Sequence, residues 1–407
     1  MKIKNFLFAV TSSLLLCSCA TIDKSTSKAE EEPFDLFPGE DTIPIMSWYS
    51  IPPADLSVER FIELKEAGFN LNFSHMYGLA EAKKALDCAQ QAGIRNLFMC
   101  GALIGKPEEI VPQVMNHPGL AGYHLQDEPQ KVHIPVLAEA NKKIRAIDPK
   151  HFTYLNLYPV GATDPFMPYI DYIHYCAKEV PTPFISYDHY GIVNNEIRGN
   201  YYQNLEIISE EARKLGKPFW AFALATAHGS YPVPNVAQLK LQMYSNLAYG
   251  AQGLQYFTYW NPGTETWNFH DAPITLEKKR SSVYDYVREV NAELQKRNFV
   301  FMRSNVEFVR HTGEKLPLGT KRLETLPDMV TKLDTHGKDA VVSLLTKNDM
   351  AYLVIVNAGI HDDMSLTITF KPGVTRIRKD GTSVAADKYV DTLLVDPGEC
   401  EVFAWKK

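Results

Sequence analysis

The sequence predicts an α/β protein, in which a (β/α)8 barrel over residues 42–303 precedes a small C-terminal antiparallel β-sandwich over residues 304–407. Eight short apolar segments begin near residues 43, 70, 95, 120, 152, 184, 218 and 252, at intervals of 25–34 residues. Amphipathic helical patterns separate them, which favours a closed parallel barrel over an open sheet. After residue 303 the helical period disappears, and short alternating runs separated by Gly, Asp and Pro predict the sandwich.

The first residues predict export. Residues 1–18 combine Lys2 and Lys4 with an apolar run, as in a signal peptide. The sequence Leu16-Cys17-Ser18-Cys19 resembles the lipobox of bacterial lipoproteins, which implies cleavage before Cys19 and lipidation of its thiol. A free cysteine beside an ordinary cleavage site is the alternative. Residues 19–41, rich in Ser, Lys and Glu, are expected to form a flexible tether. The expected location is the cell envelope, with the lipid as the membrane anchor.

Composition narrows the class of partner. The content of 45% hydrophobic and 22% charged residues suits a globular protein. The formal net charge of −6 argues against nucleic acid, because that binding depends on basic phosphate contacts. The spacing of the cysteines in the mature domain matches no zinc site, and these residues are expected to be buried free thiols. They are Cys88, Cys100, Cys176 and Cys400. Neither a metal nor a cofactor is predicted.

The predicted helices of the barrel carry local start and stop signals. Ser57 precedes a helical pattern that ends before Gly68. Residues 80–92 precede Gly93, and residues 201–215 precede Gly216, in the same way. A last helix over residues 281–296 is expected to close the barrel.

The fourth predicted strand, residues 120–129, ends abruptly at Asp127-Glu128-Pro129. Strict alternation would place Tyr123 and Leu125 toward the helices, and His124, Gln126 and Glu128 toward the barrel interior. Pro129 should end the pairing because it lacks a backbone donor. A carboxylate at the carboxyl end of a barrel strand is where such enzymes place their chemistry, although a strand-end salt bridge or helix cap is the alternative.

Other strands also alternate polar and apolar residues. The expected inward polar sets are Asn70, Asn72 and Ser74 on the second strand, Tyr154, Asn156 and Tyr158 on the fifth, and Ser186, Asp188 and Tyr190 on the sixth. Barrel interiors are mostly apolar, so these sets predict a site at the carboxyl ends of the strands, near Glu128. For any single member, a satisfied structural hydrogen bond is the alternative.

Aromatic side chains near the strand ends favour a sugar ligand, because aromatic faces stack on pyranose rings while carboxylates and amides bind hydroxyls. The predicted substrate-binding set consists of Trp48, His75, Asp127, Asn156, Tyr190, Trp220, Tyr259, Trp260 and Glu265. Each aromatic residue taken singly is more often part of a core. The loop over residues 261–272 carries Trp267, His270 and two acids, Glu265 and Asp271.

Several segments together resemble the clan A glycoside hydrolases, TIM barrels related to the β-galactosidases and cellulases. They are residues 126–129, 187–190, 250–260 and the sandwich segment 397–403. The whole is similar to the exported glycosidase-like lipoproteins of gut Bacteroidetes. The resemblance implies that Glu128 is the general acid/base and that Asp127 replaces an asparagine that holds the sugar 2-hydroxyl.

The resemblance also implies a nucleophilic glutamate at the end of the seventh strand. That strand is predicted over residues 218–228, however, and these residues contain no acid. The remaining candidates for the second carboxyl group are Asp188, Asp127, Glu265 and Asp271. Asp188 is preferred because the pleat should aim it inward, with a loop-bracing role as the alternative. These observations leave two hypotheses: a glycosidase acting on a polysaccharide or oligosaccharide, or a barrel that has lost turnover and binds glycan.

Overall fold

The computed structural model describes residues 36–37, 40–162 and 167–407, with no account of the side chains of residues 391 and 392. The predicted signal peptide, Cys19 and most of the predicted tether lie outside the described residues. The described residues belong to one compact unit. Within them, no helix is both long and apolar enough to cross a membrane.

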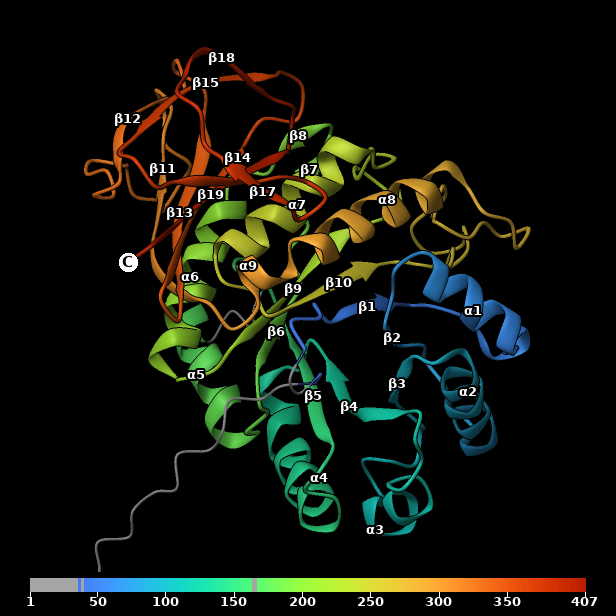
Figure 1. Ribbon diagram of the computed structural model, residues 1–407. Coiled ribbons are helices and arrows are strands. Elements are labelled where there is room, and N and C mark those ends of the chain that lie inside the picture. Colours follow the sequence, from blue (N-terminus) through green and yellow to red (C-terminus); the bar gives the residue numbers. More distant parts are fainter. Residues whose placement is uncertain (1–35, 38–39, 163–166) are drawn as a thin grey trace, which may run out of the picture. The chain divides into compact units, whose positions relative to one another are not determined.

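Eight parallel strands close into a barrel in the order β1-β10-β9-β6-β5-β4-β3-β2 (Figure 1). They are β1 (Ile45–Trp48), β2 (Leu71–Asn72), β3 (Arg95–Phe98), β4 (Leu120–Asp127), β5 (Phe152–Leu157), β6 (Ile185–Tyr187), β9 (Phe219–Leu224) and β10 (Gly253–Phe257). Each strand begins within two residues of its predicted start. The predicted (β/α)8 barrel is confirmed.

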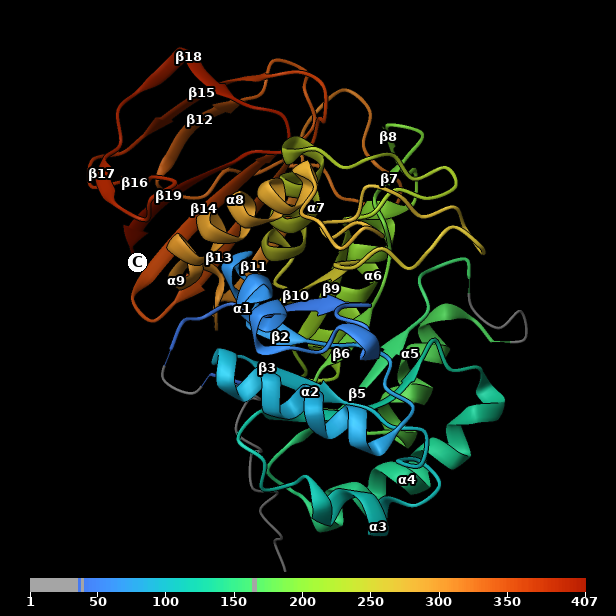
Figure 2. The ribbon, with the colours of Figure 1, turned by 90° about the vertical axis from the view of Figure 1, so that its right-hand side faces the viewer.

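Helices surround the barrel (Figure 2), and the longer ones bury apolar side chains in the core around its strands. They are η1 (Pro53–Asp55), α1 (Val58–Glu66), α2 (Leu79–Ala92), α3 (Pro107–Ile110), η2 (Val111–Gln113), η3 (Lys131–His133), α4 (Ile134–Ile147), α5 (Tyr169–Glu179), α6 (Tyr201–Lys214), α7 (Val236–Ala248), α8 (Ser282–Lys296) and α9 (Asn298–Phe301). The predicted end signals work as expected: the Ser57 side chain accepts a hydrogen bond from the backbone N–H of Arg60, and Gly93 ends α2 at φ 71°.

Aromatic side chains fill the amino-terminal half of the barrel interior. Trp220 stacks on Phe184 with ring centroids 4.1 Å apart, and Phe152 packs beside both. Leu36 joins this cluster with only 6% of its surface exposed, and its carbonyl accepts a hydrogen bond from Arg95 at the start of β3. Leu36, within the predicted tether, therefore packs against the barrel and buries apolar surface there.

The polar face of β2 points the opposite way from the prediction. Leu71 and Phe73 lie in the barrel interior, whereas Asn72 faces the helices. There the Asn72 amide donates to Asn96 Oδ1 at 2.6 Å, and Ser47 on β1 donates to Asn72 Oδ1. These polar side chains form hydrogen bonds with one another beneath the helices, so burying them there costs little free energy.

The C-terminal residues form two packed antiparallel sheets, as predicted. One sheet has the order β11-β13-β14-β19-β16-β17, and the other has the order β12-β15-β18. The strands are β11 (Asn305–His311), β12 (Val330–Asp334), β13 (Ala340–Lys347), β14 (Met350–Asn357), β15 (Met364–Phe370), β16 (Thr375–Ile377), β17 (Ser383–Ala385), β18 (Tyr389–Val395) and β19 (Cys400–Lys406). A two-stranded hairpin, β7 (Ile192–Val193) and β8 (Glu196–Ile197), comes after barrel strand β6.

A buried cluster of charges joins the barrel to the sandwich. Lys240 on α7 contacts Glu293 on α8 and Glu399 of the sandwich, with both N–O distances at 2.7 Å. Arg297 donates to the carbonyl oxygen of Cys400 at 2.8 Å, and Lys379 contacts Glu399 at 2.6 Å. Because the Glu399 side chain is only 2% exposed, its charge depends on these cations for compensation.

We expect Lys240→Met to lower the free energy of unfolding by about 3 kcal/mol, because it leaves the buried Glu399 and the partly buried Glu293 short of a cation. Urea denaturation measures the change. Lys143→Met is the matched control, since Lys143 is 41% exposed in its pair with Glu108, and its loss should leave the free energy of unfolding nearly unchanged. Equal effects of the two substitutions would show that the buried cluster does not stabilise the junction.

Candidate active site

A β-bulge decides which residues of β4 enter the barrel. His124 pairs with Tyr154 and Asp127 pairs with Asn156, so β4 has an extra residue between these two pairs. Leu125 and Gln126 therefore both face the helices; Leu125 packs in the helix-side core, and Gln126 contacts His133 at 2.9 Å. The prediction that Gln126 faces the interior is wrong, because the bulge reverses the alternation and turns Asp127 inward.

Glu128 comes after the bulge in a left-handed conformation, with φ at 45°. A non-glycine residue seldom adopts this conformation, and such residues gather at functional sites. The backbone N–H of Glu128 donates to the carbonyl oxygen of Asn156 at 2.9 Å, which continues the pairing with β5 to the rim of the barrel. As a result, Asp127 and Glu128 line the same pocket although they are adjacent in the chain.

Asn156 connects two carboxylates of the pocket. Its Nδ2 donates to Asp127 Oδ1 at 3.0 Å and to Asp188 Oδ1 at 2.7 Å. Its Oδ1 accepts from the Ser186 hydroxyl at 2.9 Å. Gln255 Nε2 donates to the Ser186 oxygen at 2.9 Å, and the Tyr154 hydroxyl donates to Gln255 Oε1 at 2.6 Å. This network sets the orientation of the Asn156 amide, so that both of its hydrogens face acids.

The pocket at the carboxyl ends of the strands has a volume of about 440 Å³. Of the predicted site residues, it brings together Trp48, Asp127, Glu128, Asn156, Asp188 and Tyr190. The sequence did not assign its other wall residues to the site: Phe222, His228, Tyr231, Phe257, Trp267 and Phe269. His228 and Phe257 could have been found from their places just after β9 and at the end of β10, whereas Tyr231 carries no such signal.

Three predicted aromatic residues lie elsewhere. Trp220 is 1% exposed in the aromatic cluster at the amino-terminal half of the barrel. Tyr259 packs outside the barrel against Phe69, with ring centroids 5.4 Å apart, and Trp260 packs outside it beneath the Arg60 guanidinium. These assignments are corrected: the chain has left the barrel interior after β10, and the surrounding helices cover both Tyr259 and Trp260.

The two remaining predicted residues lie beside the pocket. His75 packs its ring near Trp48, at a centroid distance of 6.3 Å, and is not part of the pocket wall. Glu265 lines an adjoining cavity. Among the described residues, no group of three His, Cys, Asp or Glu side chains is arranged to hold a metal ion.

The three acids influence one another's protonation. Burial raises the pKa of Asp127 to about 6, and the hydrogen bond from Asn156 partly opposes that rise. Burial and the neighbouring Asp127 raise the pKa of Glu128 to about 7. Burial, Asp127 and Glu128 raise the pKa of Asp188 well above its ordinary value. The pKa of Asp127 lies below that of Glu128, so Asp127 ionises before Glu128 as the pH rises.

This ordering gives the pocket a proton donor and a carboxylate at the same pH. Near neutrality Asp127 is ionised, while a substantial fraction of Glu128 keeps its proton. Among the described wall residues there is no Lys or Arg that would neutralise these acids. A protonated acid beside a carboxylate can drive general acid catalysis, and the aromatic walls suit a sugar ring.

Comparisons with known proteins point to one group of enzymes. A model of the family Glyco_hydro_42, described as β-galactosidase, matches residues 130–297, which include Asp188 and begin just after Glu128. The chain has the barrel fold of clan A glycoside hydrolases. No curated protein matches the sequence.

Three solved structures share this fold at low sequence identity. A catalytic mutant of a GH42 β-galactosidase from G. stearothermophilus has a TM-score of 0.65 at 10% identity, over 91% of this chain and 99% of that one. A β-galactosidase from Bacillus circulans sp. alkalophilus has a TM-score of 0.61 at 9% identity, over 91% and 100%. A glycoside hydrolase family 5 protein from Bacteroides vulgatus has a TM-score of 0.59 at 12% identity, over 90% and 89%.

We expect Asp188→Asn to stabilise the protein, and to do so more at pH 8 than at pH 5. The folded state raises the pKa of Asp188, so it holds this proton more tightly than the unfolded chain, and stability falls as pH rises above the ordinary carboxyl range. The substitution removes that loss, which thermal unfolding should show as a gain in Tm of at least ~2 °C at pH 8.

Asp285→Asn, at an exposed position on α8, is the matched control for the loss of one carboxylate. A gain in Tm for Asp188→Asn that did not grow between pH 5 and pH 8 would contradict a costly buried charge at Asp188.

Proposed function

We propose that this protein is a glycoside hydrolase that acts on an oligosaccharide or polysaccharide at the bacterial cell envelope. One observation carries the proposal: Glu128, with its pKa raised to about 7, shares an aromatic-walled pocket with Asp127 and Asp188. The barrel fold of clan A glycoside hydrolases and the β-galactosidase family match support it. By analogy with these relatives, β-galactosides are the first substrates to test.

In the proposed reaction, Glu128 is the general acid. Its proton passes to the glycosidic oxygen as the bond to the leaving sugar breaks, so that the leaving group departs as a neutral alcohol. The second carboxyl group is drawn from Asp127 and Asp188, which Asn156 holds on one nitrogen. An ionised carboxylate there stabilises the positive charge that develops on the sugar ring. A water molecule then adds its oxygen to the anomeric carbon and gives up one proton to a carboxylate of the pocket, which completes the hydrolysis. Asparagine variants of the two aspartates assign this role, because only the acting group gives a loss comparable to that of Glu128.

One observation favours a second candidate, a glycan-binding barrel without turnover. The resemblance implies a nucleophilic glutamate at the end of the seventh barrel strand, which is β9. The chain there continues as Ala225-Thr226-Ala227-His228, and His228 is the residue that reaches the pocket. Such a barrel would keep its aromatic walls and carboxylates for binding hydroxyl groups, with no covalent step.

We expect Glu128→Gln to lower kcat on an aryl β-galactoside by ~10²–10⁴-fold, the usual contribution of positioned proton transfer. Substrate affinity should survive, because glutamine keeps the shape of the side chain. In the parent, activity should fall as pH rises through about 7, where Glu128 loses its proton. A second fall as pH drops through about 6, where Asp127 gains a proton, is expected where Asp127 is the second carboxylate. Initial rates across pH measure both effects.

Glu196→Gln is the control, because Glu196 is an exposed acid on the β7–β8 hairpin. The catalytic assignment fails if Glu128→Gln cleaves at the parent rate. It also fails if the parent binds neutral glycans yet hydrolyses none across a broad panel of aryl glycosides and oligosaccharides, and the glycan-binding barrel then replaces it.

We further propose that the mature protein begins at Cys19 and is held at the membrane by lipid on that thiol. The lipobox-like sequence of residues 16–19 supports this. Cys19→Ala should move the protein from the membrane pellet to the soluble fraction, because the acyl chains provide the attachment. Mass spectrometry of the parent should find a diacylglyceryl group on residue 19, and an unmodified amino terminus there or elsewhere would refute the anchor.

A further inference from the structure

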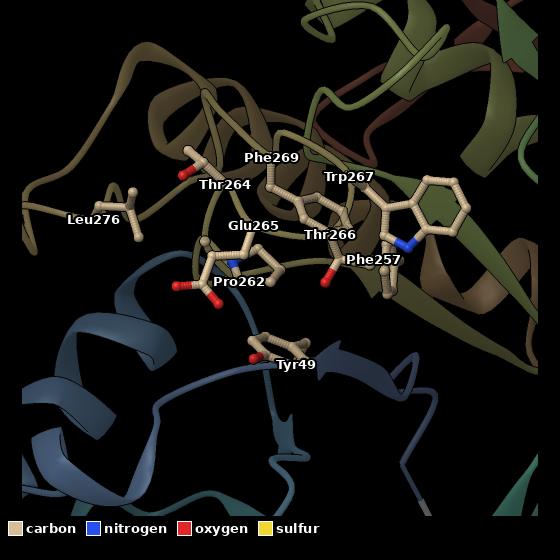
Figure 3. Close-up of a pocket in the computed structure, with 10 residues that line it drawn as sticks. Tyr49, Phe257, Pro262, Thr264, Glu265, Thr266, Trp267, Phe269 and Leu276 are labelled. Carbon is tan, nitrogen blue, oxygen red and sulfur yellow. The ribbon is translucent and has the colours of Figure 1, made fainter.

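A second cavity adjoins the candidate active site. It has a volume of about 660 Å³ and is formed mainly by the loop over residues 262–269, with Tyr49 and Leu276 completing it. Figure 3 shows the loop side chains on one side of the cavity and Tyr49 facing them, with Trp267 and Leu276 at opposite ends.

The two cavities share a wall. Phe257, Trp267 and Phe269 line both of them, so a ligand that fills the first can continue past these rings into the second. Trp267 is 62% exposed although it is a large apolar side chain. An exposed indole on the path between two pockets is free to stack on a ligand that spans them.

The chemistry of the second cavity matches a neutral sugar. Tyr49 and Trp267 offer aromatic surface, while Glu265, Thr264 and Thr266 offer oxygen atoms to hydroxyl groups. Among its described wall residues there is one acid and no Lys or Arg, so an anionic sugar would meet repulsion without a counter-charge.

We propose that this loop cavity is a further sugar subsite, which holds a neutral residue of the same glycan beyond the two residues whose shared glycosidic bond lies over Glu128. The substrate is then an oligosaccharide or a longer chain that passes over Trp267, and a glycan ending in the first pocket uses only part of the site. The inference rests on the proposed function for the nature of the ligand, but binding tests it separately from turnover.

The experiment measures affinity by calorimetry in the Glu128→Gln background, where no substrate is consumed. The probes are dimers and tetramers of neutral galacto-, gluco-, manno- and xylo-oligosaccharides. We expect at least one tetramer to bind about tenfold more tightly than its dimer, the gain that aromatic stacking can supply. Leu276→Trp should remove that gain by filling the cavity, and Trp267→Ala should remove it by deleting the shared wall.

Leu276 is 46% exposed, so a larger side chain fits there without disturbing a core. Leu394→Trp makes the same change at a 61% exposed leucine of the sandwich and should keep the gain. The subsite is refuted if no neutral tetramer binds more tightly than its dimer, or if the gain survives both Leu276→Trp and Trp267→Ala. An oligogalacturonide tetramer that binds as tightly as the best neutral one refutes the neutral assignment.

These outcomes separate the two proposals. A chain-length gain that Leu276→Trp abolishes, in a protein that hydrolyses nothing, supports the subsite and overturns the glycosidase. Hydrolysis of aryl β-galactosides without any chain-length gain in affinity supports the glycosidase and overturns the subsite.

Discussion

The amide of Asn156 donates its two hydrogens to Asp127 and Asp188, and the candidate site depends on that amide pointing one way. Two side chains of the barrel interior set the direction of this amide: the Ser186 hydroxyl donates a hydrogen bond to its oxygen, and Gln255 Nε2 donates a hydrogen bond to the Ser186 oxygen. Three barrel strands, β5, β6 and β10, therefore give interior positions to polar side chains. The network is satisfied at each of these links, which makes burial of acids beside it tolerable.

Holding three acids in one pocket works against stability, because burial raises all three pKa values and repulsion by neighbouring acids raises those of Glu128 and Asp188 further. Packing elsewhere in the structure compensates for this loss of stability. Beneath it, aromatic rings such as Trp220 and Phe184 stack, and Leu36 packs against the amino-terminal end of the barrel. The charge cluster around Lys240 ties the sandwich to two barrel helices. An active site can stay strained when the surrounding scaffold determines its position.

The acids of the pocket come from two parts of the barrel. The residues after β9 supply His228 to the pocket, whereas its three acids lie at or just after the ends of β4 and β6. Burial raises the pKa of Glu128, and the negative charge of Asp127 next to it raises that pKa further, so Glu128 can hold a proton near neutral pH. The loop after β10 then adds the aromatic surface that carries the pocket outward through Trp267.

The spacing of apolar residues, the glycines that end helices and the helix caps are local properties of the sequence. The sequence by itself therefore determined where the eight strands and the main helices lie, and that Glu128 comes at the end of a strand. Tertiary structure decided which way side chains face. One extra residue at Leu125 turns Asp127 inward, because a shift of one residue reverses every face of a strand. The polar side of β2 faces outward because the side chains of Ser47, Asn72 and Asn96 form hydrogen bonds with one another there. Tyr259 and Trp260 pack under helices that are distant from them in the sequence. Such partners are distant in sequence, and only folding brings them together.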